Sequence, residues 1–270
     1  MLAPPYGEAP RPLGVEPPEI SASSAIVLDG ASLEILYERD AFSRRAPASL
    51  TKIATAIVAA EHGNLDDRTV SLVHYWDLGD STTMALEPGD EISVRDLLYG
   101  LMLVSGNDAA YVIARHMAGS DDAFAIAMNL LVERMQLQDT QFRNPHGLTE
   151  VGHYSTAYDL ALLSRHLMAN STLREIVSTE QIIVTAERDG EEVEFDLFNH
   201  NPLLEYTPGV DGVKTGFTET AGRTFAVSVE RDGRRLYIVL LDAPDRAQDA
   251  IALIEWAYEA HEWEGGTLLP

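Results

Sequence analysis

The sequence predicts an α/β protein of the α+β type, in which one antiparallel sheet is built from both ends of the chain and a helical lobe is inserted between its strands. Short apolar runs typical of strands occur near the N-terminus and again after residue 180, whereas helical periodicity dominates from about 92 to 178. With 270 residues, 46% of them hydrophobic, the chain is long enough to bury one sizeable core.

The N-terminal part contains a tail, a hairpin and a helix. Residues 1 to about 20 hold six of the 13 prolines and no apolar period, so we expect an extended tail over 1–22. The runs Ala25–Asp29 and Leu33–Glu38 flank Gly30 and predict a β-hairpin. An alanine-rich segment that opens at Ser49 and stops at Gly63 predicts a helix.

The central region predicts several helices, separated from one another by glycine, asparagine or proline residues. These helices are Val94–Leu103, Asp108–Met117, Ala123–Leu137 and Ala157–Met168. They would form an all-helical lobe over 66–179.

From residue 181 the pattern is that of strands, two pairs of which are joined by Asp-Gly turns. The strands are Gln181–Thr185, Val193–Phe198, Gly212–Thr218, Thr224–Val229 and Leu236–Leu241. A last helix runs from about Asp245 to His261. We expect one folded domain over 23–264, with a sheet lobe of 23–65 and 180–264, and a C-terminal tail over 265–270.

Composition excludes several classes of function. The net charge of −24 would repel nucleic acid and anionic lipid surfaces. Without cysteine there is no disulfide, cysteine zinc site or thiol nucleophile. The sequence contains no run of 18 apolar residues, so it predicts no membrane span. It also shows no signal peptide, so an exported protein would already have lost its signal.

The chain contains only two lysines, Lys52 and Lys214, against 17 arginines. Arginine does not lose its proton in proteins, whereas lysine does so when it is desolvated or lies near another cation. The two lysines therefore indicate positions where arginine would not serve, the alternative being chance survival on the surface.

Ser49 precedes Lys52 by three residues at a helix start, so both side chains share one helix face. A serine hydroxyl is a weak nucleophile until a base removes its proton, and a neutral lysine is such a base. A second cation nearby would favour the neutral form. Taken alone, the pair is more simply an ordinary helix N-cap.

Two further motifs follow in the chain. Ser105-Gly106-Asn107 separates two helices and permits a turn with both polar side chains on one side. Lys214-Thr215-Gly216 lies in a strand, where Lys214 and Gly216 share a face and the glycine would let a substrate backbone lie alongside. Each alone is more simply a turn or a strand. Together they form the ordered trio S-x-x-K, S-x-N and K-T-G, which requires both lysines.

The sequence resembles the low-molecular-mass penicillin-binding proteins that act as D-alanyl-D-alanine carboxypeptidases, serine peptidase family S11. The resemblance covers roughly 25–260 and rests on Ala46–Lys52, Leu97–Ala110, Phe142–Leu148, Asp211–Gly216 and Ala221-Gly222. It implies a β-lactamase/transpeptidase-like fold, in which helices flank an antiparallel sheet.

The resemblance also implies residue roles. The catalytic set would be the nucleophile Ser49, the base Lys52, the proton relay Ser105, the amide-binding Asn107 and the charge-tuning Lys214. The substrate-binding set would be Thr215, Gly216, Phe217 and Arg246. The backbone N–H groups of Ser49 and Phe217 would form the oxyanion hole, and Thr215 and Arg246 would hold the terminal carboxylate. For Arg246, a surface position at a helix start is an equal alternative.

By resemblance, the reaction would release D-alanine from peptidoglycan pentapeptide stems outside the cytoplasm, with β-lactam antibiotics as inhibitors and no cofactor. No metal is expected, because His146 and His153 lack further ligands nearby and fit structural roles. Many family members continue into a β-rich domain and an amphipathic anchoring helix, which the sequence ending at Pro270 does not include.

Three alternatives remain open at this point. A D-alanyl endopeptidase would share the same motifs. A class A β-lactamase would need a Glu-x-x-Leu-Asn pattern, and none occurs between Asn107 and Lys214. An inactive penicillin-sensing module would be expected to lack a motif serine or lysine, and none is missing.

Overall fold

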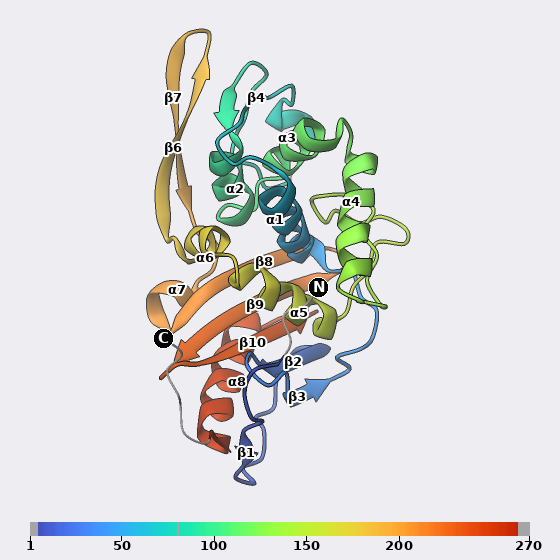
Figure 1. Cartoon of the computed structure of the whole chain (residues 1–270), viewed down its shortest axis with the longest axis vertical. Coiled ribbons are helices and arrows are strands. Elements are labelled where there is room, and N and C mark those ends of the chain that lie inside the picture. The colour runs from blue at the N-terminus through green and yellow to red at the C-terminus, as the bar shows by residue number, and fades with distance from the viewer. Residues whose placement is uncertain (1–4, 80, 264–270) are drawn as a thin grey trace.

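The computed structural model describes residues 5–79 and 81–263, which form a sheet lobe and a helical lobe (Figure 1). The main sheet is antiparallel with strand order β3-β2-β10-β9-β8, so both ends of the chain contribute to it as predicted. Its strands are β2 (Ser24–Asp29), β3 (Ile35–Arg39), β8 (Val210–Thr218), β9 (Gly222–Arg231) and β10 (Arg234–Leu241). Strand β8 is an edge strand, and it carries the lysine motif.

Both faces of this sheet are covered. In β2, Ile26 and Leu28 belong to one apolar cluster, whereas Ala25 and Val27 belong to another. Helix α5 (Ala157–Met168) packs on the first face and α8 (Arg246–Ala260) on the second (Figure 1). Because side chains alternate along a strand, a sheet buried on both faces needs continuous apolar strands, which is how β2 and β10 read in sequence.

Three helices follow the predicted segments to within a few residues: α2 (Val94–Met102), α3 (Asn107–Ala118) and α4 (Asp121–Arg134). They pack with α1 (Thr51–His62), which begins two residues after the predicted start at Ser49, and with α6 (Ser171–Ser178), which was not predicted. Three short helices are η1 (Ala48–Leu50), η2 (Tyr75–Leu78) and α7 (Leu203–Tyr206). Serine side chains cap the N-termini of α2 and α4: the Ser93 hydroxyl accepts a hydrogen bond from the Asp96 backbone N–H, and the Ser120 hydroxyl accepts one from the Ala123 backbone N–H. Within the described residues, no helix has the length and apolar character needed to cross a bilayer.

The prediction of an all-helical lobe and a single sheet is wrong in one respect. A second, four-stranded sheet has the order β4-β5-β6-β7. Its strands are β4 (Arg68–Val70), β5 (Glu91–Ser93), β6 (Gln181–Arg188) and β7 (Glu191–Phe198). The hairpin β6–β7 therefore leaves the main sheet and stands beside the helical lobe (Figure 1).

The physical reason is the burial pattern of the hairpin. Val184 and Ala186 in β6, and Phe195 and Leu197 in β7, are buried, while their neighbours in the strands are largely exposed. Such alternation gives one apolar face, which fits a sheet covered on one side only.

The N-terminal segment is extended, and part of it is fixed to the other end of the chain. Strand β1 (Arg11–Pro12) pairs with β11 (His261–Glu262). The C-terminal tail predicted over 265–270 lies outside the described residues. The domain limits of 23–264 remain a prediction.

Candidate active site

Ser49 lies in the 3₁₀ turn η1, immediately before α1 rather than inside it. Its side chain caps neither helix, so the N-cap alternative is wrong. Ala48 precedes it with a φ of 50°, in the left-handed region that non-glycine residues rarely adopt. Backbone strain of this kind costs on the order of 1 kcal/mol and often occurs where a reactive side chain must be presented.

The amine of Lys52 is fully buried, with 0% exposure, and lies 3.1 Å from Ser49 Oγ. It also contacts two acceptors, Asn107 Oδ1 at 2.6 Å and the His146 carbonyl at 2.7 Å. A neutral amine has two N–H bonds and one lone pair. Because both N–H bonds have acceptors, the lone pair is left for the Ser49 hydroxyl, and this is the geometry that a general base requires.

Electrostatics favour that neutral form. Burial is the largest cause that lowers the pKa of Lys52 well below its ordinary value, and the positive charge of Lys214 is the second. Asp108 acts in the opposite direction. The second cation expected from the sequence is therefore present and acts with the expected sign.

Lys214 is itself buried, with 2% exposure, and donates to the Thr215 carbonyl at 3.1 Å. Burial lowers its pKa to about 7, and the charge of Arg246 adds to this effect. Lys214 is therefore partly charged at neutral pH. It supplies a titratable positive charge, which an arginine would not.

Ser105 and Asn107 flank the turn at the start of α3. Ser105 has a φ of 63°, and its buried Oγ has no hydrogen-bond partner among the described residues. Asn107 Oδ1 binds Lys52, which leaves the Asn107 amide N–H groups for another partner. An unsatisfied buried hydroxyl costs about 1–3 kcal/mol, so Ser105 is poised for a bound group.

Gly216 is required by the close approach of β8 to the nucleophile. A Cβ at this position would lie 2.5 Å from Thr224 Oγ1 and 2.9 Å from the Ser49 backbone nitrogen. From the sequence we expected this glycine to admit a substrate backbone; in the structure it first allows the strand to pack against η1. Arg246 Nη1 donates to the Gly216 carbonyl at 2.7 Å and so lies at the site rather than on a free surface.

These segments line one cleft of about 860 Å³. Of the candidate residues, Ser49, Ser105, Asn107, Thr215, Gly216, Phe217 and Arg246 line it directly. Lys52 and Lys214 lie buried beneath its wall. Phe217 is 56% exposed, so its ring is available to a ligand.

Several residues that line the cleft were not predicted from the sequence. His200 lines it, and burial, followed by the charges of Lys214 and Arg246, lowers the pKa of its imidazole. Leu148 and Glu219 lie at its rim. Leu148 ends the segment Phe142–Leu148 that resembles the family, and this was its only signal in the sequence, whereas nothing singled out His200.

His146 and His153 have structural contacts. The His146 ring packs against Tyr111 at an interplanar angle of 43°. Burial, with Lys52 and His153 as further causes, lowers the pKa of His146 to about 3. Burial, together with Arg143, lowers the pKa of His153 to about 4. Within the described residues, no three histidine or acidic side chains are grouped so that they could hold a metal.

His153 belongs to a chain of hydrogen bonds that ends at the nucleophile turn. Its Nδ1 accepts from the Arg143 backbone N–H at 3.1 Å, so Nε2 carries the proton. Nε2 donates to Thr51 Oγ1 at 2.8 Å, and Thr51 donates in turn to the Ala48 carbonyl at 2.8 Å. Gly147 packs against the same carbonyl, where a Cβ would lie 2.0 Å from the oxygen. The carbonyl just before Ser49 is thus fixed from two sides.

Asp108 fixes the rim of the cleft next to Ser105. Its buried carboxylate accepts N–H groups of Met84, Leu86 and Ala109 at 2.9–3.1 Å. Burial raises its pKa, and these backbone hydrogen bonds oppose that shift. Asp108 thereby ties the loop before β5 to the turn that carries Ser105 and Asn107.

A serine beside a neutral buried amine, with a second lysine on an edge strand, defines a serine acyl-transfer site of the penicillin-binding type. The D-alanyl-D-alanine carboxypeptidase family, peptidase family S11, matches residues 12–245. The chain belongs to this family.

Named relatives agree with this assignment. D-alanyl-D-alanine carboxypeptidase DacF of Bacillus subtilis is 33% identical over 249 residues, 89% of this chain and 63% of its own length. DacB2 of Mycobacterium tuberculosis is 33% identical, with 92% of this chain and 86% of that protein covered. The chain thus spans less than two thirds of the Bacillus relative.

Solved structures share the fold. The Streptomyces K15 DD-transpeptidase superimposes with a TM-score of 0.87 at 30% identity, covering 91% of this chain and 100% of that one. A D-alanyl-D-alanine carboxypeptidase from Mycobacterium tuberculosis gives 0.83 at 32% identity, with coverages of 92% and 96%. The predicted β-lactamase/transpeptidase-like fold is confirmed.

Proposed function

We propose that this chain is a serine-type D-alanyl-D-alanine carboxypeptidase that removes the terminal D-alanine from peptidoglycan pentapeptide stems. The observation that carries the proposal is the Lys52 amine, whose N–H groups are engaged by Asn107 and His146 while its nitrogen lies 3.1 Å from Ser49 Oγ. Family membership and the names of the relatives support it.

In the acylation step, Lys52 removes the Ser49 proton and Oγ attacks the carbonyl carbon between the two D-alanines. The backbone N–H groups of Ser49 and Phe217 stabilise the oxyanion. When the C–N bond breaks, Ser105 passes a proton to the leaving amine and regains one from Lys52. Its buried hydroxyl, for which the described part of the chain offers no hydrogen-bond partner, supports this role.

The substrate lies along the free edge of β8. Its terminal carboxylate is held by the Thr215 hydroxyl and by the charges of Lys214 and Arg246, the latter already anchored on the Gly216 carbonyl. Asn107 donates its amide N–H to the substrate peptide. Because the chain ends of stem peptides carry a carboxylate, two cations at this end of the cleft favour a carboxypeptidase over an internal cut.

Water then attacks the ester carbonyl while Lys52 takes its proton. Lys52 returns that proton to Ser49 Oγ as the bond between Oγ and the acyl carbon breaks, which restores the free serine and the neutral amine. A β-lactam enters by the same step, but its leaving group stays attached, so the ester persists. We expect inhibition by β-lactams for this reason. We place the activity outside the cytoplasm, because the wall substrate lies there, and expect no nucleic-acid partner because of the net charge of −24.

A second candidate is transfer of the acyl group to an amine, because a solved relative of 30% identity is named a DD-transpeptidase. Both reactions share the acyl-enzyme and differ in the acceptor. Incubation with a D-Ala-D-Ala peptide and glycine separates them. Free shortened peptide indicates hydrolysis, and a glycine adduct indicates transfer.

The test is mass spectrometry of the intact protein after penicillin, with the adduct mapped to a peptide, followed by measurement of D-alanine release. We expect one adduct on Ser49, and none in Ser49→Ala. Ser171→Ala, an exposed serine at the start of α6, is the matched control and should label normally. An adduct elsewhere would refute the proposal, and labelling without D-alanine release would indicate a penicillin sensor.

A further inference from the structure

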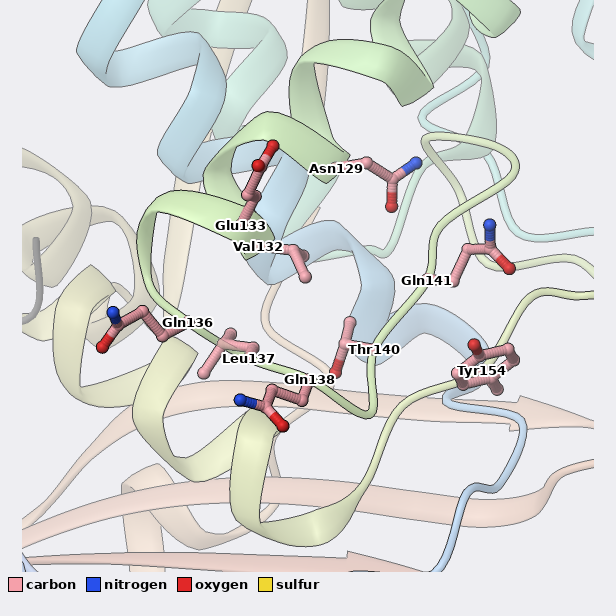
Figure 2. Close-up of a pocket in the computed structure, with 9 residues that line it drawn as sticks. All are labelled: Asn129, Val132, Glu133, Gln136, Leu137, Gln138, Thr140, Gln141 and Tyr154. Carbon is pink, nitrogen blue, oxygen red and sulfur yellow. The ribbon is translucent and has the colours of Figure 1, made fainter.

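A hollow of about 690 Å³ lies at the C-terminal end of α4, outside the catalytic cleft (Figure 2). The side chains of Glu133, Gln136 and Gln138 around it are exposed and point in different directions, so they present no common set of groups to a ligand (Figure 2). The catalytic cleft differs in this respect. One residue of its lining, Thr82, contacts the turn that carries Ser105.

Thr82 lies in the loop before β5 and makes two hydrogen bonds to that turn. Its Oγ1 donates to the Ser105 carbonyl at 2.8 Å. Its own carbonyl accepts the backbone N–H of Asn107, also at 2.8 Å. The two bonds lie on either side of Gly106. Thr82 therefore holds the backbone of both residues that this turn contributes to the catalytic set.

The peptide group between Ser105 and Gly106 is held from both sides. Thr82 Oγ1 binds its carbonyl, and its N–H donates to the Gly100 carbonyl at 2.9 Å. Ser105 has a φ of 63°, in a region that few non-glycine residues occupy, so surrounding contacts must keep the turn in place. Rotation of this peptide group would break both bonds and move the Ser105 side chain. The Thr82 hydroxyl is one of the two contacts that oppose this rotation.

The loop that carries Thr82 has its own anchor. Two residues further on, the Met84 backbone N–H donates to the buried carboxylate of Asp108 at 3.0 Å, and the Leu86 N–H does so at 3.0 Å. Thr82 itself is exposed at the surface of the cleft. The loop is therefore held in place without the Thr82 hydroxyl, whereas the turn at Ser105 depends on it.

We propose that Thr82 is a positioning residue, which holds the Ser105 hydroxyl where it passes a proton to the leaving amine. This inference rests on the proposed function, in which Ser105 is that proton relay. The buried Ser105 Oγ has no hydrogen-bond partner among the described residues, so no bond of its own fixes it. Its position follows from the backbone that Thr82 binds.

Thr82→Val removes the hydroxyl and keeps the backbone bond to Asn107. We expect kcat/KM for D-alanine release from a D-Ala-D-Ala peptide to fall about tenfold, which corresponds to about 1.4 kcal/mol, the size of one hydrogen bond. Thr82→Ser keeps a hydroxyl and should remain within about twofold of the parent protein. A urea midpoint for each variant checks that the fold is intact.

A thiolester analogue of the peptide, in which a thiolate replaces the leaving amine, separates positioning from a general loss of structure. The C–N bond needs a proton on its nitrogen to break, whereas the C–S bond breaks with release of a thiolate. Thr82→Val should therefore lower kcat/KM for the thiolester by less than about twofold. Thr83→Val is the matched control, because the Thr83 hydroxyl bonds to no described residue, and it should behave like the parent with both substrates.

Three results would overturn the inference: an unchanged kcat/KM of Thr82→Val for the peptide, an equal loss with both substrates, or a Thr82→Ser protein no better than Thr82→Val. If the parent protein is labelled by penicillin on Ser49 and releases D-alanine, any of these results refutes this inference alone. A parent that is labelled without releasing D-alanine refutes the proposed function, and the labelling rate of Thr82→Val then decides this inference. A parent that takes up no penicillin on Ser49 refutes both.

Discussion

Replacing Lys214 with methionine is expected to stabilise the fold while impairing acylation. The side chain is 2% exposed, so its charge is held in a poorly solvated site. Its pKa falls from 10.5 to about 7, first because of burial and second because of Arg246. Each pH unit between these values corresponds to about 1.4 kcal/mol, so the charged amine costs the fold at most about 5 kcal/mol at low pH.

The sign follows from proton binding. Below pH 7 both the folded and the unfolded chain bind the Lys214 proton, and the full cost is present. Between pH 7 and 10.5 only the unfolded chain binds it, so the stability of the parent protein rises with pH. Since methionine loses the hydrogen bond to the Thr215 carbonyl, we expect a net gain of about 2 kcal/mol at pH 6, shrinking toward pH 10.

Urea unfolding at pH 6, 8 and 10 measures this difference, and fluorescent penicillin labelling measures acylation, which we expect to slow about 10²-fold. Arg115→Met, an exposed arginine of α3, is the matched control and should show no such pH-dependent gain. A Lys214→Met protein less stable than its parent at pH 6, or a difference independent of pH, would refute the electrostatic reasoning.

Three other substitutions test the site. Lys52→Arg should abolish acylation with the fold intact, because arginine keeps the charge but does not act as a base; near-normal penicillin labelling would contradict this. Arg246→Ala should weaken D-alanine release more than penicillin labelling, and unchanged release would remove Arg246 from the substrate site. His153→Gln should lower kcat about tenfold with little change in KM, since it loosens the Ala48 carbonyl through Thr51. If stopped-flow measurements gave the variant the same acylation rate constant as the parent protein, this hydrogen-bond chain would not position Ser49.

The sequence allowed the motif residues to be found because their chemistry restricts residue type. Of the two strongly basic side chains, only lysine loses its proton when it is buried, and only two lysines exist in the chain, Lys52 and Lys214. The strands of the main sheet were also predictable, since burial on both faces makes them continuously apolar. The structure brings these motifs to one cleft, while the roles given to individual residues remain proposals.

Other features depend on tertiary contacts that leave no local pattern. The alternating pattern of β6 and β7 fits a sheet covered on one face, but the pairing of β6 with β5, which sets the sheet they join, leaves no local signal in the sequence. His200 enters the cleft because its loop hydrogen-bonds to the Leu103 carbonyl, at the end of a helix far away in sequence. The actual reason for Gly216 also required coordinates, because its crowding partner is the turn at Ser49.

The active centre joins distant parts of the polypeptide: η1 near its beginning, the α2–α3 turn in its middle, and β8 and α8 near its end. A growing or truncated chain that lacks β8 would leave the Lys52 amine without the neighbouring cation that helps to keep it neutral. Such a chain would present an unreactive Ser49. Covalent capture by penicillin would then report completed folding, and would allow maturation to be timed in a living cell.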